Sequence, residues 1–464
     1  MDVDGLLAKT AAQAANYLSG LDQRPVGVRA DHSELLARLG GPLPEKPTDA
    51  DTVVDDLVRA ADPGLIGSAG PRYYGFVVGG SLPSALAADW LTSVWDQNAG
   101  GYVLSPAAAV VEEVTAGWLV ELLGLPPGTS VGFTTGATMA NFICVAAARS
   151  RVLESVGWDV ERNGLFGAPP IEVVVGADRH VSLELALRYL GLGSERVRVV
   201  PADDQGRMRA DLLGEELRRC DGPIIVCAQA GDVNSGAFDP LGQICDVAHE
   251  HGAWVHVDGA FGLWAAASPD RRHLIAGIEN ADSCGTDGHK WLNVPYDSGL
   301  AFVADPVAHH QAMSLLAASY LVFGEGAERD NANWVPEMSR RARGFPIWAA
   351  IRELGRSGIA EMVDRGCECA RRFADGLGAV PGVEILNEVV LNQVLVRFTA
   401  PDGGDSDAFT RDVVSRVQAD GTSWLGGTTW QGKAAMRISV SNWSTTEADV
   451  DRSIEAILRA ARQS

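Results

Sequence analysis

Short apolar runs alternate with helix-like stretches over the middle of the chain, from about residue 70 to residue 305. The apolar runs occupy residues 171–176, 196–200, 223–229, 253–258 and 300–305. Amphipathic stretches separate them at residues 137–153, 182–191, 209–219 and 240–252. Strands that are apolar throughout are buried on both faces, and their alternation with helices is typical of a mainly parallel sheet covered by helices on each side. The sequence therefore predicts an α/β fold.

The two ends of the chain differ from this central region. The first sixty residues read as helices broken by a Gly/Pro-rich stretch, and the last part mixes strands with helices, the first of them near 345–354. We therefore expect an N-terminal helical segment (1–65), a large α/β domain (66–340) and a smaller C-terminal α+β domain (341–464). A stretch rich in glycine and charge at 322–334 is predicted to be a mobile loop.

Composition excludes several functions. The 464 residues carry a formal net charge of −22, and such a surface repels phosphate backbones and anionic lipids. We therefore expect neither nucleic acid nor membrane as a partner. The seven cysteines form no CxxC pair and the start of the chain lacks the features of a signal peptide, which indicates a cytoplasmic protein. Cys367 and Cys369 would point to different sides of a helix, so no metal site is predicted.

Ligands of open parallel sheets bind beyond the carboxyl ends of the strands. The segment VGFTTGATMANF at 131–142 follows this pattern, because an apolar run leads through a turn into a helix. Small residues there, including Ala137 and Thr138, would let backbone N–H groups approach an anion, and the helix dipole would favour its charge. Most turns of this kind are only helix caps, so the segment alone is a weak signal.

Three further side chains stand near the ends of apolar runs. His180 could stack on an aromatic cofactor, although a loop histidine with a satisfied polar edge is the commoner case. Asp258 ends a buried strand, where a carboxylate needs a partner such as a protonated pyridine nitrogen; turn chemistry is the alternative. Lys290 lies among small and apolar residues. Burial lowers the pKa of an amine, which could then condense with an aldehyde, whereas a solvated loop lysine is the default.

Together these features match the needs of pyridoxal 5′-phosphate (PLP). Its phosphate needs N–H donors, its ring needs a flat neighbour, its pyridine nitrogen needs a carboxylate, and its aldehyde needs an amine. The protonated ring then stabilises a carbanion at the Cα atom of an amino acid. The sequence therefore predicts a PLP enzyme that acts on amino acids.

The matching motifs extend from about residue 70 to the C-terminus. They are PRYYGF (71–76), SPAAAVVEE from Ser105, TGATMAN (135–141), GAFDP (236–240), HVDGAFG (256–262), ADS…DGHKWL (281–292) and SRRARGFPIWAAIRELGRSG (339–358). Through them the chain resembles the group II PLP-dependent amino-acid decarboxylases, within the fold-type I superfamily of aspartate aminotransferase. The resemblance implies a seven-stranded, mainly parallel sheet, and a homodimer with swapped N-terminal helices and active sites at the interface.

The resemblance also implies catalytic roles. Lys290 would hold PLP as a Schiff base, Asp258 would partner the pyridinium nitrogen, and His180 would stack on the ring and help to position the substrate. Ala260 would pack on the opposite face of the ring.

Other matched positions would contact the cofactor around its edge. Ala137 and Thr138 would bind the phosphate, with His289 near it. The sequence GDVNSGAFD departs from the usual GTTxxGAFD, so Asn234 and Ser235 are expected to supply polar contacts.

Candidate substrate contacts are less specific. Tyr74, Phe76 and Tyr102 offer aromatic lining, although aromatic residues near such a site can simply belong to the core. Arg437 occupies a region where fold-type I enzymes often bind a carboxylate, for which a bidentate pair would suit it; an interdomain ion pair is the alternative.

The implied reaction is decarboxylation of an L-amino acid to an amine and CO2, through a quinonoid intermediate. Many relatives carry a tyrosine on the loop before the SRR motif, but the loop at 322–334 has none. Tyr320 precedes it, and Phe323 is its first aromatic residue. Phenylalanine at that place accompanies aldehyde formation in some relatives. Aldehyde-forming oxidative decarboxylation, retro-aldol cleavage and transamination therefore stay open, and the sequence does not identify the amino acid.

Overall fold

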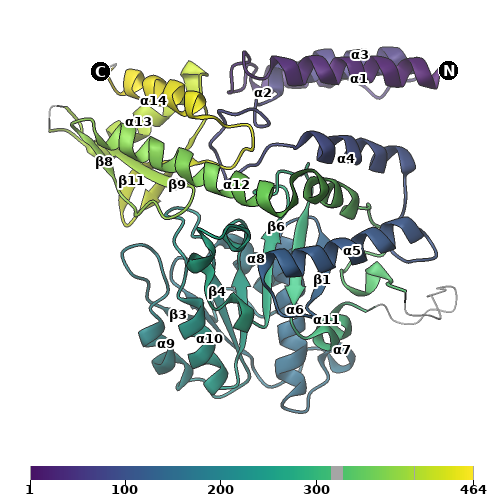
Figure 1. Ribbon diagram of the computed structural model, residues 1–464, viewed down its shortest axis with the longest axis vertical. Helices are drawn as coiled ribbons and strands as arrows, with labels where there is room; N and C mark the ends of the chain where they lie inside the picture. The colour runs from purple at the N-terminus through teal and green to yellow at the C-terminus, as the bar shows by residue number, and fades with distance from the viewer. Residues whose placement is uncertain (1, 315–327, 402, 463–464) are drawn as a thin grey trace.

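A seven-stranded sheet forms the centre of the computed structural model, which describes residues 2–314, 328–401 and 403–462. Its order is β1-β7-β6-β5-β4-β2-β3 (Figure 1). The strands are β1 (Ser130–Thr134), β2 (Glu172–Gly176), β3 (Arg198–Val200), β4 (Ile224–Gln229), β5 (Trp254–Asp258), β6 (Ser283–Asp287) and β7 (Gly299–Val303). Only β7 runs antiparallel to its neighbours within this sheet, so the predicted mainly parallel seven-stranded sheet is confirmed.

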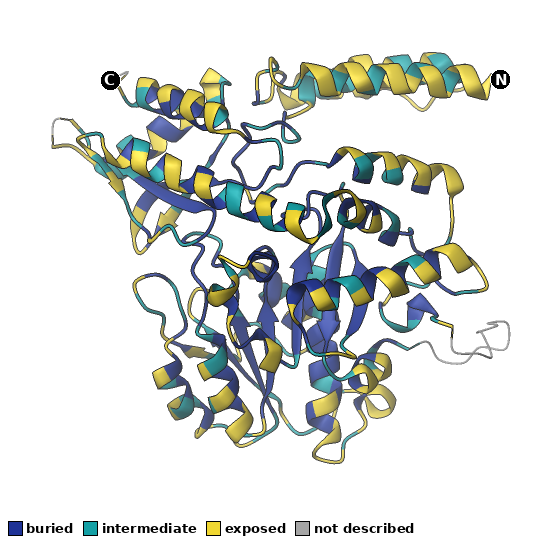
Figure 2. Cartoon of the chain, viewed as in Figure 1, coloured by how far each residue is buried: buried dark blue, intermediate teal, exposed yellow. Residues whose placement is uncertain are grey.

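Helices cover both faces of this sheet. They are α5 (Pro106–Leu123), α6 (Ala137–Glu154), α8 (Val181–Tyr189), α9 (Ala210–Leu217), α10 (Leu241–Glu250) and α11 (Pro306–Met313). Two further helices pack on helices instead: α4 (Pro83–Trp95) on α12 (Gly344–Gly378) and α7 (Val160–Asn163) on α6. Alternate residues of β2 face opposite sides: Val173 and Val175 pack with residues of α6 and α8, and Val174 packs with those of α9 and α10. Figure 2 shows the strands buried between these layers. This double burial explains why the strands are apolar throughout.

Three helices at the N-terminus lie along one side of the molecule (Figure 1). They are α1 (Val3–Gly20), α2 (His32–Leu39) and α3 (Ala50–Ala61), and each begins after an aspartate cap. None of the three contains a buried residue within this single chain. Their apolar side chains therefore stay accessible to another surface.

The C-terminal part contains a second sheet of four antiparallel strands, in the order β10-β11-β9-β8. Its strands and helices are α12 (Gly344–Gly378), β8 (Val383–Ile385), β9 (Gln393–Phe398), α13 (Ser406–Asp420), β10 (Gly426–Trp430), β11 (Lys433–Ser439) and α14 (Glu447–Arg462). The helix predicted at 345–354 is the first part of α12, which is interrupted at Gly355, where φ is +60°. The predicted small α+β region is present, while the exact domain limits stay a prediction.

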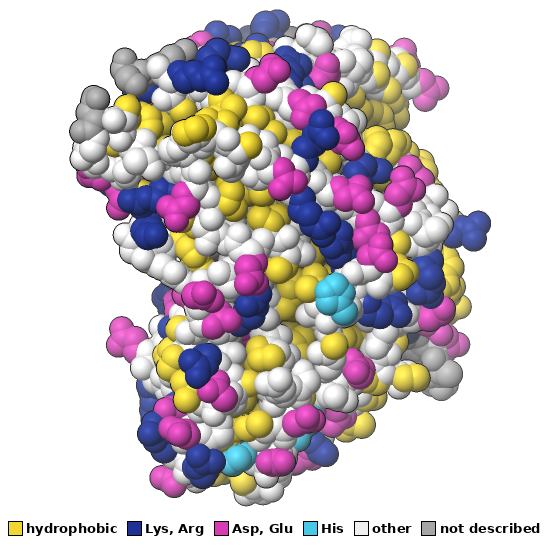
Figure 3. Space-filling view, turned by 60° about the vertical axis from the view of Figure 1, so that its left-hand side comes forward, with side chains coloured by type: hydrophobic (Ala, Val, Ile, Leu, Met, Phe, Trp, Pro, Cys, Tyr) yellow, Lys and Arg dark blue, Asp and Glu magenta, His cyan; other side chains and the backbone are white. Residues whose placement is uncertain are grey.

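Short 3₁₀ helices complete the described chain. They are η1 (Asp62–Gly64), η2 (Gly262–Ala267), η3 (Arg272–Ile275), η4 (Ile278–Asn280) and η5 (Asn331–Asn333). Within the described ranges, every helix is too short or too polar to cross a membrane. On the face shown in Figure 3, acidic, basic and apolar side chains are interspersed.

Candidate active site

Strand register brings the candidate residues to one edge of the central sheet. Gln229 at the end of β4 pairs with Asp258 at the end of β5, and Asp258 pairs with Gly285 of β6. The helices α6 and α8 both begin at this edge, because each follows a parallel strand directly. The carboxyl ends of the strands and the N-termini of two helices therefore meet, as expected for a ligand site of an open α/β sheet.

Asp258 is buried and held entirely by neutral donors. Its Oδ2 atom accepts hydrogen bonds from Asn141 Nδ2 at 2.8 Å and from Ser182 Oγ at 3.2 Å. Its Oδ1 atom accepts one from the backbone N–H of Ala260 at 3.1 Å. These bonds fix the carboxylate at the strand end. No cation among the described residues forms an ion pair with it, so its charge is available to a cationic partner.

His180 caps the N-terminus of α8. Its Nδ1 atom accepts a hydrogen bond from the backbone N–H of Ser182 at 3.2 Å and lies 2.7 Å from the Ser182 hydroxyl. Because Nδ1 is an acceptor, the proton of the neutral ring is assigned to Nε2. Burial lowers the pKa of His180; the charge of Asp258 opposes this shift, and that of Lys290 adds to it. The imidazole is therefore neutral at pH 7.

Lys290 follows the end of β6, the strand beside β5, and its charge and that of Asp258 both act on the pKa of His180. Its side chain is 18% exposed, and its Nζ atom is 2.9 Å from Asp287 Oδ2 and 6.0 Å from the centre of the Phe261 ring. The structure thus brings together the three residues that the sequence nominated for catalysis.

Asp287 is a site residue that the sequence reasoning missed. It ends β6 and is buried, and its Oδ1 atom accepts a hydrogen bond of 2.6 Å from the backbone N–H of Ala137. His289 Nε2 lies 3.4 Å from the same oxygen atom. The signal was present in the sequence, since an aspartate three residues before a buried lysine at a strand end is an obvious partner for it.

The turn that opens α6 is tightly packed. A Cβ atom at Gly136 would lie 3.2 Å from both Asp287 Oδ1 and His289 Cε1, and one at Gly299 would lie 2.4 Å from the Cα atom of Gly136. The first N–H groups of a helix have no acceptor within the helix, so the amides of Ala137, Thr138 and the next residues point toward this corner. The structure places His289 there too, as the sequence suggested.

Asn234 and Ser235 belong to the turn after β4. The Ser235 hydroxyl is buried and donates to the carbonyl of Gln205 at 2.6 Å, and Asn234 Oδ1 accepts from Thr428 Oγ1 at 2.9 Å. Both backbone N–H groups donate to Asp232 Oδ1. These side chains stabilise the turn, and a direct contact of either with a cofactor stays a prediction.

The four candidate substrate contacts are placed differently. Tyr74 is 1% exposed and packs in the C-terminal core, where its hydroxyl lies 3.3 Å from Ser453 Oγ, so it has no free surface for a substrate. Phe76 is 63% exposed and stacks on Trp424. The half-buried Tyr102 precedes two exposed apolar residues.

Arg437 is the fourth of these candidates. It lies on β11, opposite Gly426 of β10, and is half-buried. Burial lowers the pKa of its guanidinium, and the charge of Asp232 opposes the shift. Its charge also lowers the pKa of His180, so it lies within electrostatic reach of the candidate site.

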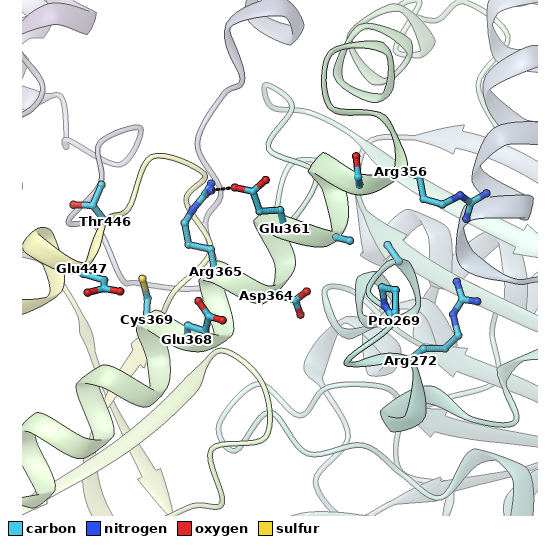
Figure 4. Close-up of a pocket in the computed structure, with 13 residues that line it drawn as sticks. Pro269, Arg272, Arg356, Glu361, Asp364, Arg365, Glu368, Cys369, Thr446 and Glu447 are labelled. Carbon is cyan, nitrogen blue, oxygen red and sulfur yellow. Dashed lines mark hydrogen bonds and ion pairs between the residues drawn. The ribbon is translucent and has the colours of Figure 1, made fainter.

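A separate cavity of about 1050 Å³ lies along α12, away from these residues. Figure 4 shows that its labelled side chains carry both charges, including the Arg365–Glu361 pair at 3.5 Å. None of the candidate catalytic residues lines it.

Comparisons with known proteins identify the family and the fold of the chain. The family model of the pyridoxal-dependent decarboxylase conserved domain matches residues 34–399. The aromatic-L-amino-acid decarboxylase of Bacillus atrophaeus is 26% identical over 444 residues, covering 93% of this chain and 90% of that protein. Two solved structures share the fold across nearly their whole length. They are Oryza sativa TDC with PLP and tryptamine (TM-score 0.92, 24% identity, 99% and 97% coverage) and Rhodiola rosea 4-hydroxyphenylacetaldehyde synthase (TM-score 0.88, 23% identity, 100% and 99% coverage).

The family match confirms the cofactor and the enzyme class predicted from the sequence. PLP is the cofactor of this family, and the curated relatives are named decarboxylases. The chain belongs to the pyridoxal-dependent decarboxylase family.

Proposed function

We propose that this protein removes the α-carboxylate of an L-amino acid as CO2 and releases the amine, with Lys290 holding PLP covalently. The observation that supports the proposal is the meeting of Lys290, His180 and Asp258 at one sheet edge, beside the N-terminus of α6. When bound, PLP supplies a protonated ring that stabilises negative charge at the Cα atom of the substrate.

The donors and acceptors at this edge fit PLP. Asp258 is a buried carboxylate with only neutral hydrogen-bond donors, so a protonated ring nitrogen would be its natural counter-charge. The amides at the start of α6, with Thr138 and His289, would hold the phosphate. Ala260, two residues after Asp258, has a small side chain that would pack on the face of the ring opposite His180.

His180 would orient the carboxylate that is lost. Its neutral ring presents the Nε2 proton, which is able to donate to a substrate carboxylate, while Ser182 holds Nδ1. Arg437 would also contact the substrate. It is half-buried and forms no ion pair with a described residue, so its positive charge is free to bind a carboxylate. Phe76 and Tyr102 would line the entrance.

A second outcome, aldehyde formation, is supported by one feature of the chain. No tyrosine occurs in the loop 322–334. Tyr320 and Phe323 lie outside the described residues. A structural neighbour named as a 4-hydroxyphenylacetaldehyde synthase has the same fold.

We further propose that the protein is a cytoplasmic homodimer. All seven cysteines are free thiols, and six of them are buried, which suits a reducing compartment. Exposed apolar side chains gather on α4, α5 and the segment between them. They include Trp90, Leu91, Val94, Trp95, Val103, Leu104, Val110 and Val114. A second copy would cover them, and it would bring Tyr102 to an interface.

The decisive experiment incubates the PLP-loaded enzyme with each common L-amino acid and measures CO2, amine, aldehyde, ammonia and peroxide separately. Equimolar CO2 and amine are expected for at least one amino acid. Equimolar aldehyde, ammonia and CO2 with peroxide would replace the proposal by the aldehyde-forming alternative. Absence of CO2 from every substrate would contradict both.

A further inference from the structure

The anion-binding corner at the start of α6 already holds an anion that belongs to the protein. The backbone N–H of Ala137 donates to Asp287 Oδ1 at 2.6 Å, and an N–H group has one hydrogen to give. The other carboxylate oxygen contacts Lys290 Nζ at 2.9 Å. Asp287 is therefore bracketed by a helix N-terminus and by the lysine proposed to hold the cofactor.

We propose that Asp287 and the PLP phosphate compete for the backbone N–H of Ala137, so that cofactor binding exchanges one anion for another at the start of α6. The corner is also closely packed, because a Cβ atom at Gly136 would lie 3.2 Å from both Asp287 Oδ1 and His289 Cε1. A phosphate oxygen that accepts from Ala137 must displace the carboxylate.

Asp287 also satisfies two groups at this corner. The amine of Lys290 and the backbone N–H of Ala137 both contact its carboxylate, and a shielded polar group without a partner is costly. Asp287 is therefore a positioning residue for the amine and for the start of α6. Its negative charge then opposes the phosphate and weakens cofactor binding by electrostatic repulsion.

Two ligands that differ only in the phosphate separate this effect from all others. Pyridoxine 5′-phosphate and pyridoxine both lack the aldehyde, so neither depends on Lys290 chemistry or on turnover. Their dissociation constants are measured with cofactor-free wild type, Asp287→Asn and Asp287→Ser by tryptophan fluorescence. Asp282→Asn is the matched control. Asp282 lies just before the start of β6, at the end opposite Asp287, and its Oδ2 atom accepts a hydrogen bond from the backbone N–H of Val255.

Both Asp287 variants are expected to bind pyridoxine 5′-phosphate at least about tenfold more tightly than wild type, since a like charge has been removed. Binding of pyridoxine should change by less than about twofold, and Asp282→Asn should behave as wild type. Equal or weaker binding of the phosphate ligand by the Asp287 variants, or equal tightening for both ligands, would overturn the proposal.

A structure of the wild-type protein with pyridoxine 5′-phosphate tests the same idea without any variant. The Asp287 Oδ1 to Ala137 N contact should be lost in the complex, and its retention would refute the exchange. These measurements rest on cofactor binding alone. Their failure would leave the proposed decarboxylation standing, and a failure of decarboxylation would leave the exchange untouched.

Discussion

Two buried carboxylates at neighbouring strand ends are held in different ways. Asp287 contacts the amine of Lys290, whereas Asp258 is bonded only to neutral groups from Asn141, Ser182 and Ala260. A buried anion without a cation is costly unless a ligand supplies one. This difference favours Asp258 over Asp287 as the proposed partner of the cofactor's ring nitrogen.

Asp258→Asn keeps the size of the side chain and one acceptor oxygen but removes the negative charge. We expect the rate of CO2 release to fall at least about 100-fold, because an unprotonated ring is a poor electron acceptor. PLP should still attach to the variant, as followed by its absorbance. A variant that binds PLP and keeps more than about half of the wild-type rate would show that Asp258 does not control the ring nitrogen.

His180 should act as a neutral donor over a wide pH range. Burial lowers its pKa below the ordinary 6.5, so the imidazole stays neutral above that pH and becomes protonated only at lower values. We expect kcat/KM to show no loss from His180 between pH 8 and pH 6.5, and a decline that belongs to it only below 6.5. His180→Gln keeps a donor but cannot titrate.

The His180→Gln variant should therefore lose that acidic decline while having a lower kcat/KM at every pH. A decline of wild-type kcat/KM centred above pH 6.5 that disappears in His180→Gln would contradict the assignment of a neutral ring.

The sequence alone predicted six of the seven central strands and missed β6. The segment 131–142 contained all of β1 except its first residue. Apolar runs identified β2, β3, β4, β5 and β7 within one or two residues at each end. The sequence of β6, SCGTD, is small and polar, although all five residues are buried between β5 and β7. Burial in the middle of a sheet overrode the weak local pattern, and this explains why Asp287, which ends β6, was overlooked as well.

One helix is tied to the sheet by a buried histidine. His309 of α11 lies with Nδ1 2.8 Å from the hydroxyl of Ser130 in β1, and its Nε2 donates to the carbonyl of Trp334 at 2.9 Å. Burial lowers the pKa of His309 to about 3. The folded state therefore excludes a proton that the unfolded chain binds below pH 6.5, and stability falls as the pH drops from 6.5 toward 3.

The loss from His309 alone should reach about 2 kcal/mol at pH 5, from 1.36 kcal/mol for each pKa unit. Urea unfolding at pH 7.5 and pH 5 measures it. His309→Asn should reduce the difference between the two pH values by that amount, whereas Ser130→Ala should lower stability at both and keep the difference. Equal pH dependence in wild type and His309→Asn would contradict the buried neutral histidine.

Two features of the whole molecule support the proposed homodimer. The surface of α4 and α5 exposes apolar side chains, and the three N-terminal helices contain no buried residue. Both would be covered by a second copy of the chain. The sequence predicted a homodimer only through its family resemblance, since the pattern of a helix cannot say whether its apolar side faces its own chain or another. Tyr74 illustrates the same limit: an aromatic residue near a functional motif turned out to pack in the core.

The homodimer makes a direct prediction about two residues on α4. Val94 and Trp95 are 64% and 47% exposed in the single chain. The double variant Val94→Glu/Trp95→Glu should be monomeric in size-exclusion chromatography with light scattering, because two charges would have to be buried in the interface. Val199→Glu, at an exposed apolar site on β3, is the control and should keep the wild-type mass. A dimeric double variant, or a wild-type monomer, would contradict the model of the interface.

Lys290 is proposed to hold the cofactor, and the small number of lysines in the chain makes the attachment easy to locate. The chain contains only four lysines, at positions 9, 46, 290 and 433. Reduction of the PLP-loaded protein with borohydride, followed by peptide mass spectrometry, locates the attached group. We expect one pyridoxyl phosphate per chain, on Lys290, and none in Lys290→Arg. A label at position 9, 46 or 433, or unchanged labelling of Lys290→Arg, would contradict this proposal.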